Sequence, residues 1–327
     1  MNPVYVADSA AVCALGDTLD QIWPRLCAGE SAIQQICRFE PHELGCHIAA
    51  CVADLVAGVA PNRICQLAGR ALAQLRPVPA DTPVIWAGVK GDAEWVEACA
   101  EDRPPPACFL PRHYRTWVCE RMQLVDRGAE INAACASSAA ALAFGAEMIS
   151  QGECASVLIC AADIVSRFTH TGFAALRATS PTACRPLDEA RDGLCLGDGA
   201  VAVLLANATT CAQHGYRPTG RLVGWGLAND ANHITGPARD ASGLVAAIQA
   251  ALQSAARQPD EIPAWCLHGT GTVYNDAMEL TALERVFRTR RPQLFSVKGA
   301  LGHTLGAAGG LEVVLSLCAL KEQVIPA

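Results

Sequence analysis

Short apolar runs alternate, over the first 215 residues, with longer stretches whose apolar positions follow the period of a helix. The short runs predict strands and the longer stretches predict helices. The strands are expected at 2–9, 83–89, 128–134, 154–165 and 195–207. The helices are expected at 18–29, 64–75, 137–150 and about 168–178. This alternation is typical of an α/β fold.

The same alternation starts again after residue 215. Strands are expected at 220–228, 264–270 and 293–299. Helices are expected at 241–256, 276–287 and 302–321. The chain is therefore predicted to form two related halves, 1–215 and 216–327, with five strands in the first half and three in the second.

Two of the predicted helices, 137–150 and about 304–320, are apolar almost all the way round. A helix without a polar face must be covered on every side, most simply by lying between two sheets. Both helices carry small residues, such as Ala139 and Gly309, that allow a close approach. We therefore expect these two helices to lie together in the middle of the molecule.

The composition agrees with a large globular protein, because 51% of the 327 residues are apolar and 17% are charged. The net charge of −7, without a basic run, gives no indication of nucleic acid or a membrane surface as a partner. The N-terminal residues do not resemble a secretory signal, so a cytoplasmic location is expected. The 17 cysteines include no CxxC pair, so we expect neither a metal site nor a disulfide framework.

One of these cysteines has a distinctive setting. In the segment AACASS, Cys135 lies between a predicted strand and the N-terminus of an apolar helix. The helix dipole and the free backbone N–H groups at that position favour the thiolate, which is expected to lower the thiol pKa. The same N–H groups can stabilise an oxyanion formed when the thiolate attacks a thioester carbonyl. Cys135 is therefore the candidate nucleophile.

Two histidines and a lysine follow predicted strand ends in the second half: His268 in LHGTGTVYND, and Lys298 and His303 in SVKGALGHTLGAAGG. Strand ends on one side of a sheet are where open α/β folds place their sites. The remaining histidines lack such a setting and are interpreted as surface or structural residues: His42, His47, His113, His170, His214 and His233.

Four motifs now carry a family resemblance: AACASS, CRPLDEARDGLCLGDGAVAVLL (184–205), HGTGTVYND and KGALGHTLGAAGGLE. Their order and spacing closely resemble the elongating β-ketoacyl-acyl-carrier-protein synthases, thiolase-like condensing enzymes of fatty acid and polyketide synthesis. The resemblance extends, with interruptions, from about residue 5 to the end of the chain. It implies a five-layered αβαβα sandwich of two similar halves, with the nucleophile in the first half and both histidines in the second.

The resemblance also implies a role for each matching residue. Cys135 would accept the acyl primer as a thioester, while His268 and His303 would act on the malonyl extender. Loss of CO2 would leave an enolate that attacks the Cys135 thioester, which is a decarboxylative Claisen condensation. Lys298 matches the active-site lysine. No cofactor is implied, because the substrates are carried on the phosphopantetheine of acyl carrier protein, which is the expected partner of a homodimer or heterodimer.

Five further residues are candidates for supporting roles. Glu312 falls in a predicted buried helix, where an unpaired carboxylate is costly, so a charge pair with Lys298 is expected. Thr270 and Thr272 match positions that bind the pantetheine arm. Asp276 and Glu279 match acidic positions beside the site, although capping of their helix or exposure to solvent explains them equally well.

The resemblance is incomplete at the C-terminus. After the residues that match KEQVIPA, the family continues with two more strands and a glycine-rich gating loop, so the second half is expected to be incomplete. The segment between PVIWAGV and INAAC is also shorter than in the family. Two explanations stay open: a fragment of a longer protein, or a compact member that a partner subunit completes.

Three other functions remain as alternatives. A non-catalytic partner of the chain-length-factor type fits the short C-terminus, but such proteins typically lack the nucleophile that Cys135 supplies. A thiolase is less consistent, because its second cysteine belongs in the C-terminal stretch without a match. His268 together with His303 fits the two-histidine elongating type of synthase rather than the Cys-His-Asn type. A thiolase-like protein with an idle site is the third alternative.

Overall fold

A computed structural model of the chain describes residues 2–41, 46–89, 91–100, 110–233 and 236–326. Its largest element is a six-stranded mixed sheet with the strand order β5-β4-β6-β7-β1-β8. The strands are β1 (Val4–Cys13), β4 (Val84–Ala87), β5 (Gly128–Ile131), β6 (Ser156–Asp163), β7 (Gly199–Ala206) and β8 (Gly220–Leu222). β4 pairs in parallel with β5 and β6, and the other pairs are antiparallel.

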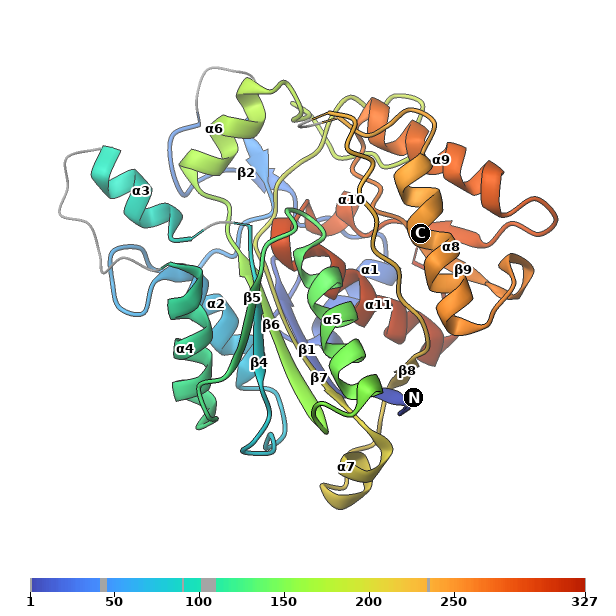
Figure 1. Cartoon of the computed structure of the whole chain (residues 1–327). Coiled ribbons are helices and arrows are strands. Elements are labelled where there is room, and N and C mark those ends of the chain that lie inside the picture. The colour runs from blue at the N-terminus through green and yellow to red at the C-terminus, as the bar shows by residue number, and fades with distance from the viewer. Residues whose placement is uncertain (1, 42–45, 90, 101–109, 234–235, 327) are drawn as a thin grey trace.

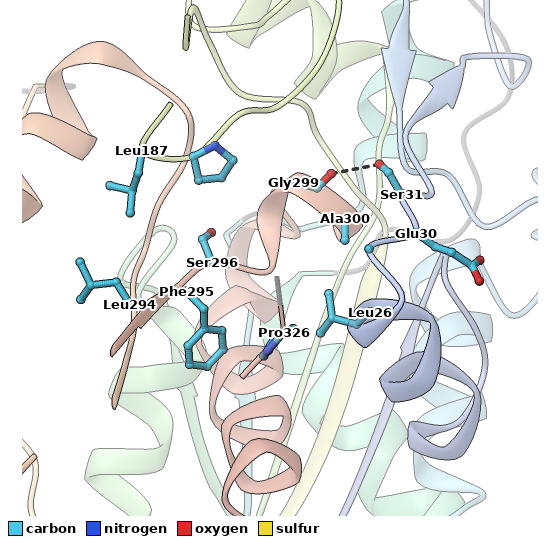
Figure 2. Close-up of a pocket in the computed structure, with 12 residues that line it drawn as sticks. Leu26, Glu30, Ser31, Leu187, Leu294, Phe295, Ser296, Gly299, Ala300 and Pro326 are labelled. Atoms are coloured by element: carbon cyan, nitrogen blue, oxygen red, sulfur yellow. Dashed lines mark hydrogen bonds between the residues drawn. The ribbon is translucent and has the colours of Figure 1, made fainter. Parts of the chain in front are cut away.

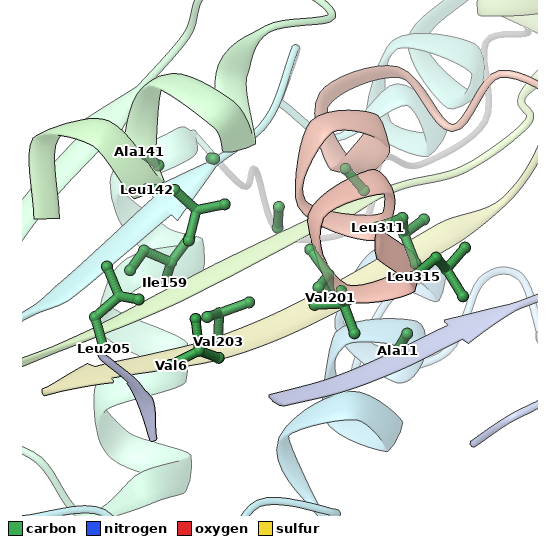
Figure 3. Close-up of a cluster of buried hydrophobic side chains, with 14 of the residues drawn as sticks. Val6, Ala11, Ala141, Leu142, Ile159, Val201, Val203, Leu205, Leu311 and Leu315 are labelled. Carbon is green, nitrogen blue, oxygen red and sulfur yellow. The ribbon is translucent and has the colours of Figure 1, made fainter. Parts of the chain in front are cut away.

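Helices cover both faces of this sheet (Figure 1). α2 (Arg63–Leu72) and α4 (Pro111–Met122) pack on one face, whereas α5 (Ser137–Gln151) and α11 (Ala308–Glu322) pack on the other with α1 (Leu19–Cys27). β6 and β7 are buried along their whole length because they are covered from both sides. Figure 3 shows the larger core cluster, in which side chains of α5 and α11 meet those of the central strands.

A second, smaller sheet lies beyond α11. It consists of the parallel strands β9 (Ala264–Cys266) and β10 (Gln293–Phe295). α8 (Ser242–Ala255) and α9 (Val273–Val286) form a cluster that includes Trp265 of β9. The molecule thus has five layers in the order helix, sheet, helix, sheet, helix, as the resemblance implied.

The remaining elements are short connections between these layers: β2 (Gln34–Gln35), β3 (Ile48–Ala49), α3 (Ala93–Ala100), α6 (Arg167–Ala175), α7 (Ala208–Gln213) and α10 (Lys298–Leu301). Two single-turn 3-10 helices, 259–261 and 305–307, complete the described structure. Among the described residues, no helix is long and apolar enough to cross a membrane.

The five strands predicted in the first half are confirmed, but two predictions in the second half are wrong. The strand expected at 220–228 ends at Leu222 and pairs with β1 of the first sheet. Gly224 and Gly226 instead approach α8 closely, since a Cβ at either position would lie within 2.4 Å of a backbone oxygen of that helix. The helix expected from 302 starts at Ala308, because residues 302–304 form a turn around His303 and residues 305–307 form a 3-10 helix.

The two apolar helices pack against each other through small residues, as predicted. A Cβ added at Gly309 would lie 2.8 Å from the Cβ of Ala139, and the Gly310 N–H donates to Ser138 Oγ at 2.8 Å. The expectation that they are covered on every side is correct only in part. Phe144 of α5 is 47% exposed and Leu320 of α11 is 57% exposed, so each helix has one uncovered apolar position.

We predict that Gly309→Ala destabilises the protein. The gain in helix propensity is about 0.5–1 kcal/mol, whereas forcing a methyl group against Ala139 costs about 1–3 kcal/mol. A net loss of about 1 kcal/mol is expected in urea unfolding. Gly172→Ala is the control, because nothing lies within 4 Å of a Cβ at that helical position. Equal stability changes in the two variants would contradict the proposed helix contact.

Candidate active site

Cys135 lies in the tight turn between β5 and α5. Asn132 accepts a hydrogen bond from the Ala134 N–H through Oδ1 and donates from Nδ2 to the Val89 carbonyl at 2.8 Å. Ser137 Oγ accepts from the Ala133 N–H and donates to the Ala134 carbonyl. Ala134 has a φ of 50°, a left-handed conformation that costs energy for a residue with a side chain. Side-chain bonds on both sides of Cys135 therefore hold a strained turn in place.

His303 faces Cys135 from the turn that precedes α11. Its Nε2 lies 3.0 Å from the Cys135 Sγ, although the two residues are 168 positions apart in the chain. The His303 N–H donates to the Cys195 carbonyl, and the His303 carbonyl accepts from the Gly197 N–H. Gly302 allows this close approach, because it has a φ of 68° and a Cβ there would lie 2.5 Å from the Leu196 carbonyl oxygen.

The backbone fixes the tautomer of His303. The Leu305 N–H donates to His303 Nδ1 at 3.1 Å, so Nδ1 is the nitrogen that carries the lone pair. In the neutral ring the proton must then reside on Nε2, the atom that faces Cys135. His303 therefore presents an N–H donor to the reaction site rather than a base.

His268 and Lys298 complete the group. The His268 and His303 rings meet edge to face with their centroids 5.2 Å apart. Lys298 is 1% exposed, and its Nζ donates to the His268 carbonyl and forms an ion pair with the Glu312 carboxylate. The charge pair predicted between Lys298 and Glu312 is thus present. It connects α11 to the segment that carries His268.

Burial and Lys298 set the electrostatics of the site. Burial, with the nearby positive charge of Lys298, holds the pKa of His268 and of His303 well below the ordinary histidine value. Both rings are consequently neutral at neutral pH. Burial would also lower the pKa of Lys298, but the Glu312 carboxylate outweighs it and raises this pKa, so the ammonium stays charged.

The thiol departs from the prediction. Burial raises the pKa of Cys135, and the positive charge of Lys298 offsets only part of this increase. The expectation that the helix N-terminus lowers the thiol pKa is therefore wrong for the free protein. The desolvation of the half-buried thiolate outweighs the favourable helix end and the lysine.

Two buried carboxylates hold the segment 268–270. Glu279 is 2% exposed and accepts hydrogen bonds from the backbone N–H groups of His268 and Gly269, both at 2.7 Å. Asp276 is fully buried and accepts from the N–H groups of Thr270 and Leu187. Neither of the two structural explanations, capping or exposure to solvent, is correct, because both carboxylates bind a neighbouring loop.

The two threonines of the HGTGT segment lie together, with their Oγ1 atoms 2.9 Å apart. Thr270 is buried and Thr272 is half-buried at the start of α9. They are thus placed on the same loop as His268, one and three residues beyond Gly269. The hydroxyl pair can donate and accept hydrogen bonds toward an amide-containing ligand.

One combination of described residues could bring three metal-ligating atoms together: Cys135, His268 and His303, with these atoms within 4.8 Å of one another. A metal ion would need the Nε2 lone pair of His303, because only Nε2 faces the cysteine. That nitrogen carries the ring proton as long as Nδ1 accepts from Leu305. The donor set therefore fits a metal poorly and fits thiol chemistry better.

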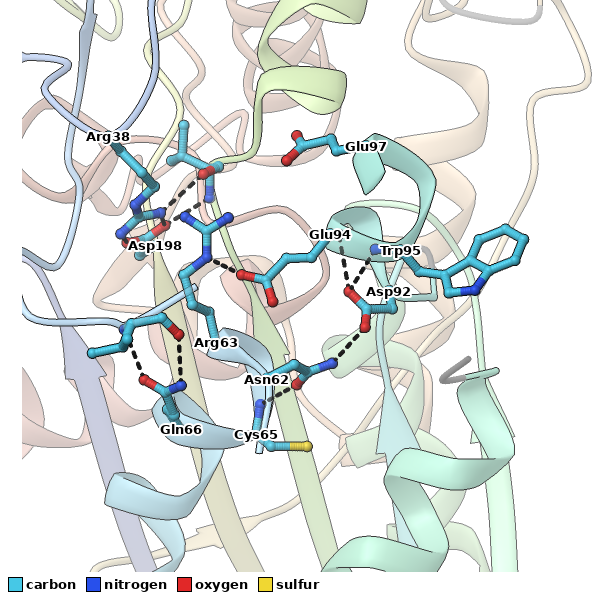
Figure 4. A network of polar contacts seen from close by, with 12 residues as sticks. Arg38, Asn62, Arg63, Cys65, Gln66, Asp92, Glu94, Trp95, Glu97 and Asp198 are labelled. Carbon is cyan, nitrogen blue, oxygen red and sulfur yellow. Dashed lines mark hydrogen bonds and ion pairs between the residues drawn. The ribbon is translucent and has the colours of Figure 1, made fainter. Parts of the chain in front are cut away.

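Sequence reasoning missed the residues that support the turns. Asp198 is fully buried and accepts hydrogen bonds from Arg38 (Figure 4). It also accepts from the N–H groups of Val52 and Val165. It directly follows Gly197, which binds the His303 carbonyl. Asn132 and Ser137 were also missed. Asn132 and Ser137 could have been found, because a polar residue close to a candidate nucleophile is a usable sequence signal. The sequence carries no such signal for the pairing of Asp198 with the distant Arg38.

A separate pocket of about 360 Å³ opens at the molecular surface (Figure 2). Leu26, Ser31, Leu294 and Pro326 lie in its wall, and Ser31 Oγ donates to the Gly299 carbonyl at 3.0 Å. Neither Cys135 nor the two histidines line this pocket. It lies instead beside the segment that contains Lys298.

Comparison with known protein families gives two matches. The family described as the N-terminal domain of β-ketoacyl synthase matches residues 128–210, and the C-terminal domain of β-ketoacyl synthase matches residues 219–327. The chain belongs to the β-ketoacyl synthase family. The predicted resemblance is thus confirmed, and with it the assignment to the acyltransferases that condense acyl thioesters.

Individual relatives agree with this assignment. A 3-oxoacyl-[acyl-carrier-protein] synthase 2 of Synechocystis sp. is 27% identical over 360 residues, which cover 99% of this chain and 86% of that protein. A synthase of the same name from Staphylococcus aureus is 31% identical over 200 residues, covering 59% of this chain and 50% of that protein. The structure of the ishigamide ketosynthase/chain length factor superimposes with a TM-score of 0.90 at 26% identity, covering 99% of this chain and 87% of that one. The predicted thiolase-like fold is confirmed.

We predict that Glu279→Gln weakens both stability and the placement of His268. The amide can accept only one of the two backbone N–H bonds and turns a donor toward the other, which costs about 1–3 kcal/mol of unfolding free energy. Urea unfolding measures the loss. Glu284→Gln, an exposed position on the same helix, is the control.

We also predict that Glu279→Gln and Glu284→Gln differ in how their stability depends on pH. Burial raises the pKa of Glu279 from 4.5 to about 7, so the folded protein binds this proton more tightly than the unfolded chain. The contribution of Glu279 to the free energy of unfolding therefore decreases as the pH rises from 4.5 to about 7. The Glu279→Gln variant should lack this decrease, and an unchanged pH profile would contradict the assignment.

Proposed function

We propose that the chain catalyses a decarboxylative Claisen condensation of an acyl primer with a malonyl thioester, giving a β-ketoacyl thioester. The observation that carries this proposal is the contact between the Cys135 Sγ and the His303 Nε2 at 3.0 Å, with the His268 ring beside it. A nucleophile and two imidazoles meet in one partly enclosed site. The charged pair of Lys298 and Glu312 lies next to them.

In the first half-reaction, Cys135 takes the acyl group. Its Sγ attacks the thioester carbonyl of the primer, a C–S bond forms, and the bond to the carrier thiol breaks. The carrier thiol leaves with the proton that Cys135 loses. The raised pKa of Cys135 keeps the thiol protonated in the free protein at neutral pH, and the N–H of His303 stabilises the thiolate when it forms.

In the second half-reaction, the histidines act on the extender. Cleavage of the carboxylate from the malonyl thioester releases CO2 and leaves an electron pair that is delocalised onto the thioester oxygen. The N–H on His303 Nε2, together with the neutral His268, can stabilise that enolate oxygen. The carbanion then attacks the Cys135 thioester, so that a C–C bond forms and the thiolate is released.

The substrates are proposed to arrive on the phosphopantetheine of acyl carrier protein. The name of the Synechocystis relative includes acyl carrier protein. The hydroxyl pair of Thr270 and Thr272 lies on the His268 loop and is suited to bind the amides of that arm. No further cofactor takes part in either half-reaction as written.

A second candidate function is a non-catalytic partner subunit of the chain-length-factor type. The likeness to a structure described as a ketosynthase/chain length factor favours it. The intact group of Cys135, His268 and His303 favours catalysis. The two functions differ in one measurable property, which is whether the chain takes up an acyl group.

We predict that two variants separate the half-reactions. Cys135→Ala removes the acyl acceptor, so condensation should stop while decarboxylation of malonyl carrier protein continues. His303→Ala should keep acyl transfer at a reduced rate, because the Cys135 thiolate loses its N–H donor. The variant also loses an N–H donor to the enolate worth about 3–4 kcal/mol, so CO2 release should fall on the order of a hundredfold or more. The assays are intact-protein mass after acylation and release of labelled CO2.

Exposed His214, stacked on Tyr216, supplies the control variant His214→Ala, which should leave both rates unchanged. A parent chain that shows neither activity favours the partner-subunit function. Normal CO2 release from His303→Ala would refute the role given to this histidine.

The edge of the large sheet supports the proposed dimer. β5 is an edge strand, and along it Gly128 and Glu130 are exposed. The adjoining turn of Cys135 and the exposed Phe144 of α5 extend this surface. An unpaired strand edge beside exposed apolar groups is a typical site for association with a second copy or a related ketosynthase.

We predict that the purified chain sediments as a dimer and that Phe144→Glu shifts it toward the monomer. A carboxylate at this position would have to be desolvated in the interface, which is costly. Leu227→Glu is the control, because Leu227 is exposed and follows β8 at the opposite edge of the sheet. A monomeric parent, or equal sedimentation of both variants, would refute the assigned interface.

A further inference from the structure

His170 has an unusual environment. It belongs to α6 and is 1% exposed. Within the described part of the chain, neither ring nitrogen has a hydrogen-bond partner. Its nearest aromatic neighbour is Phe39, whose ring meets the imidazole at a centroid distance of 5.7 Å. A buried polar group without a partner is rare in folded proteins and calls for a specific explanation.

His170 lies beside an apolar cluster that adjoins the active site. We call this cluster the inner cluster; its buried members are Ile36, Ala49, Val165, Leu194, Leu196 and Leu305. Phe39, which contacts His170, packs against it, and so does Phe173 from the next turn of α6. Leu196 forms a bridge to His303, and Leu305 donates its N–H to the His303 ring. His170, through Phe39, and His303, through Leu196 and Leu305, thus both adjoin the inner cluster.

The active site has a polar side and an apolar side. His268, Lys298 and Glu312 occupy the polar side, where a hydrocarbon chain would bury charges without replacing their partners. The inner cluster and Val89 form the apolar side. An acyl group attached to Cys135 is therefore expected to extend among the inner cluster, toward the residues at its rim.

Burial lowers the pKa of His170, and the nearby His47 adds to this effect, so the ring is neutral at neutral pH. A neutral imidazole offers one N–H donor and one acceptor nitrogen. A saturated chain satisfies neither of them. A hydroxyl group can bind either nitrogen, and a keto group can accept from the N–H.

We propose that His170 determines the class of acyl group that the enzyme accepts, favouring chains that carry a hydroxyl or keto oxygen over saturated chains. This inference rests on the proposed condensing function. His170 acts on selectivity, because a site built to hydrogen-bond an oxygen rejects the analogue that leaves the site's own polar groups unpaired. In this proposal His170 is a specificity residue at the far end of the acyl site.

The experiment measures acyl transfer to Cys135 of the full chain by intact-protein mass. The substrates are octanoyl carrier protein and its 3-, 5- and 7-hydroxy derivatives, each offered in competition with octanoyl. The parent should prefer at least one hydroxy derivative on the order of tenfold, as expected for one satisfied hydrogen bond in a buried site. The position of the preferred hydroxyl reports the distance from the thioester to His170.

Three variants test the role of the imidazole. His170→Leu should lose the preference and accept octanoyl at least as well as the parent does. His170→Gln, which keeps a donor and an acceptor, should retain part of the preference. His214→Leu, on the exposed ring, should behave as the parent. The melting temperature of His170→Leu should be unchanged or higher, since no protein hydrogen bond is lost.

Different failures have different meanings. If the parent takes no acyl group from any thioester, the proposed condensing function is refuted. Equal uptake of octanoyl and all hydroxy derivatives by an active parent would refute only the role of His170. That role is also refuted if the preference survives in His170→Leu, or if this variant melts lower and loses all acyl transfer in parallel.

Discussion

The close contact between α5 and α11 is the constraint on which the rest of the structure depends. Cys135 lies two residues before the start of one helix, and His303 lies in the turn before the other. Their side chains can meet only if the N-terminal ends of the helices nearly touch. Gly309 and Gly310 make this possible, because both lack the Cβ that would collide with α5 or with β7. Small residues in the central layer thus set the geometry of the chemistry.

The buried charges depend on the same contact. Glu312 is carried by α11, and its carboxylate pairs with Lys298 next to the His268 loop. Lys298 can remain charged in a buried position only because that carboxylate and the His268 carbonyl replace water. The positive charge in turn contributes to keeping both histidines neutral. A single ion pair therefore links helix packing to the protonation states of the site.

Much of the fold and site was predictable from sequence, for physical reasons that differ between elements. The five strands of the first half are short, mainly apolar runs that alternate with helical patterns, and this local signal predicts them. Residues 220–228 have a similar composition, but Gly224 and Gly226 pack against α8, and this contact is not visible in a local pattern. The pairing of Lys298 with Glu312 was predictable because a buried carboxylate needs a partner.

Other features depend on three-dimensional surroundings. The helix end before Cys135 was visible in the sequence, but the extent of burial that raises its pKa was not. The support of the His303 turn by Asp198 and Arg38 joins segments 160 positions apart, without any local signal. His170 was interpreted as an ordinary surface or structural histidine, because a missing hydrogen-bond partner becomes apparent only when all neighbours are placed.

The bond from the Leu305 N–H to His303 Nδ1 has a consequence for how the site tolerates mutation. The donor is a main-chain group, so nearly any codon change at position 305 leaves it in place. Proline alone among the twenty residues lacks this N–H, and its ring is also incompatible with the φ of 52° at this position. The tautomer of His303 is thus set by the path of the backbone. It does not depend on which side chain, proline excepted, occupies position 305.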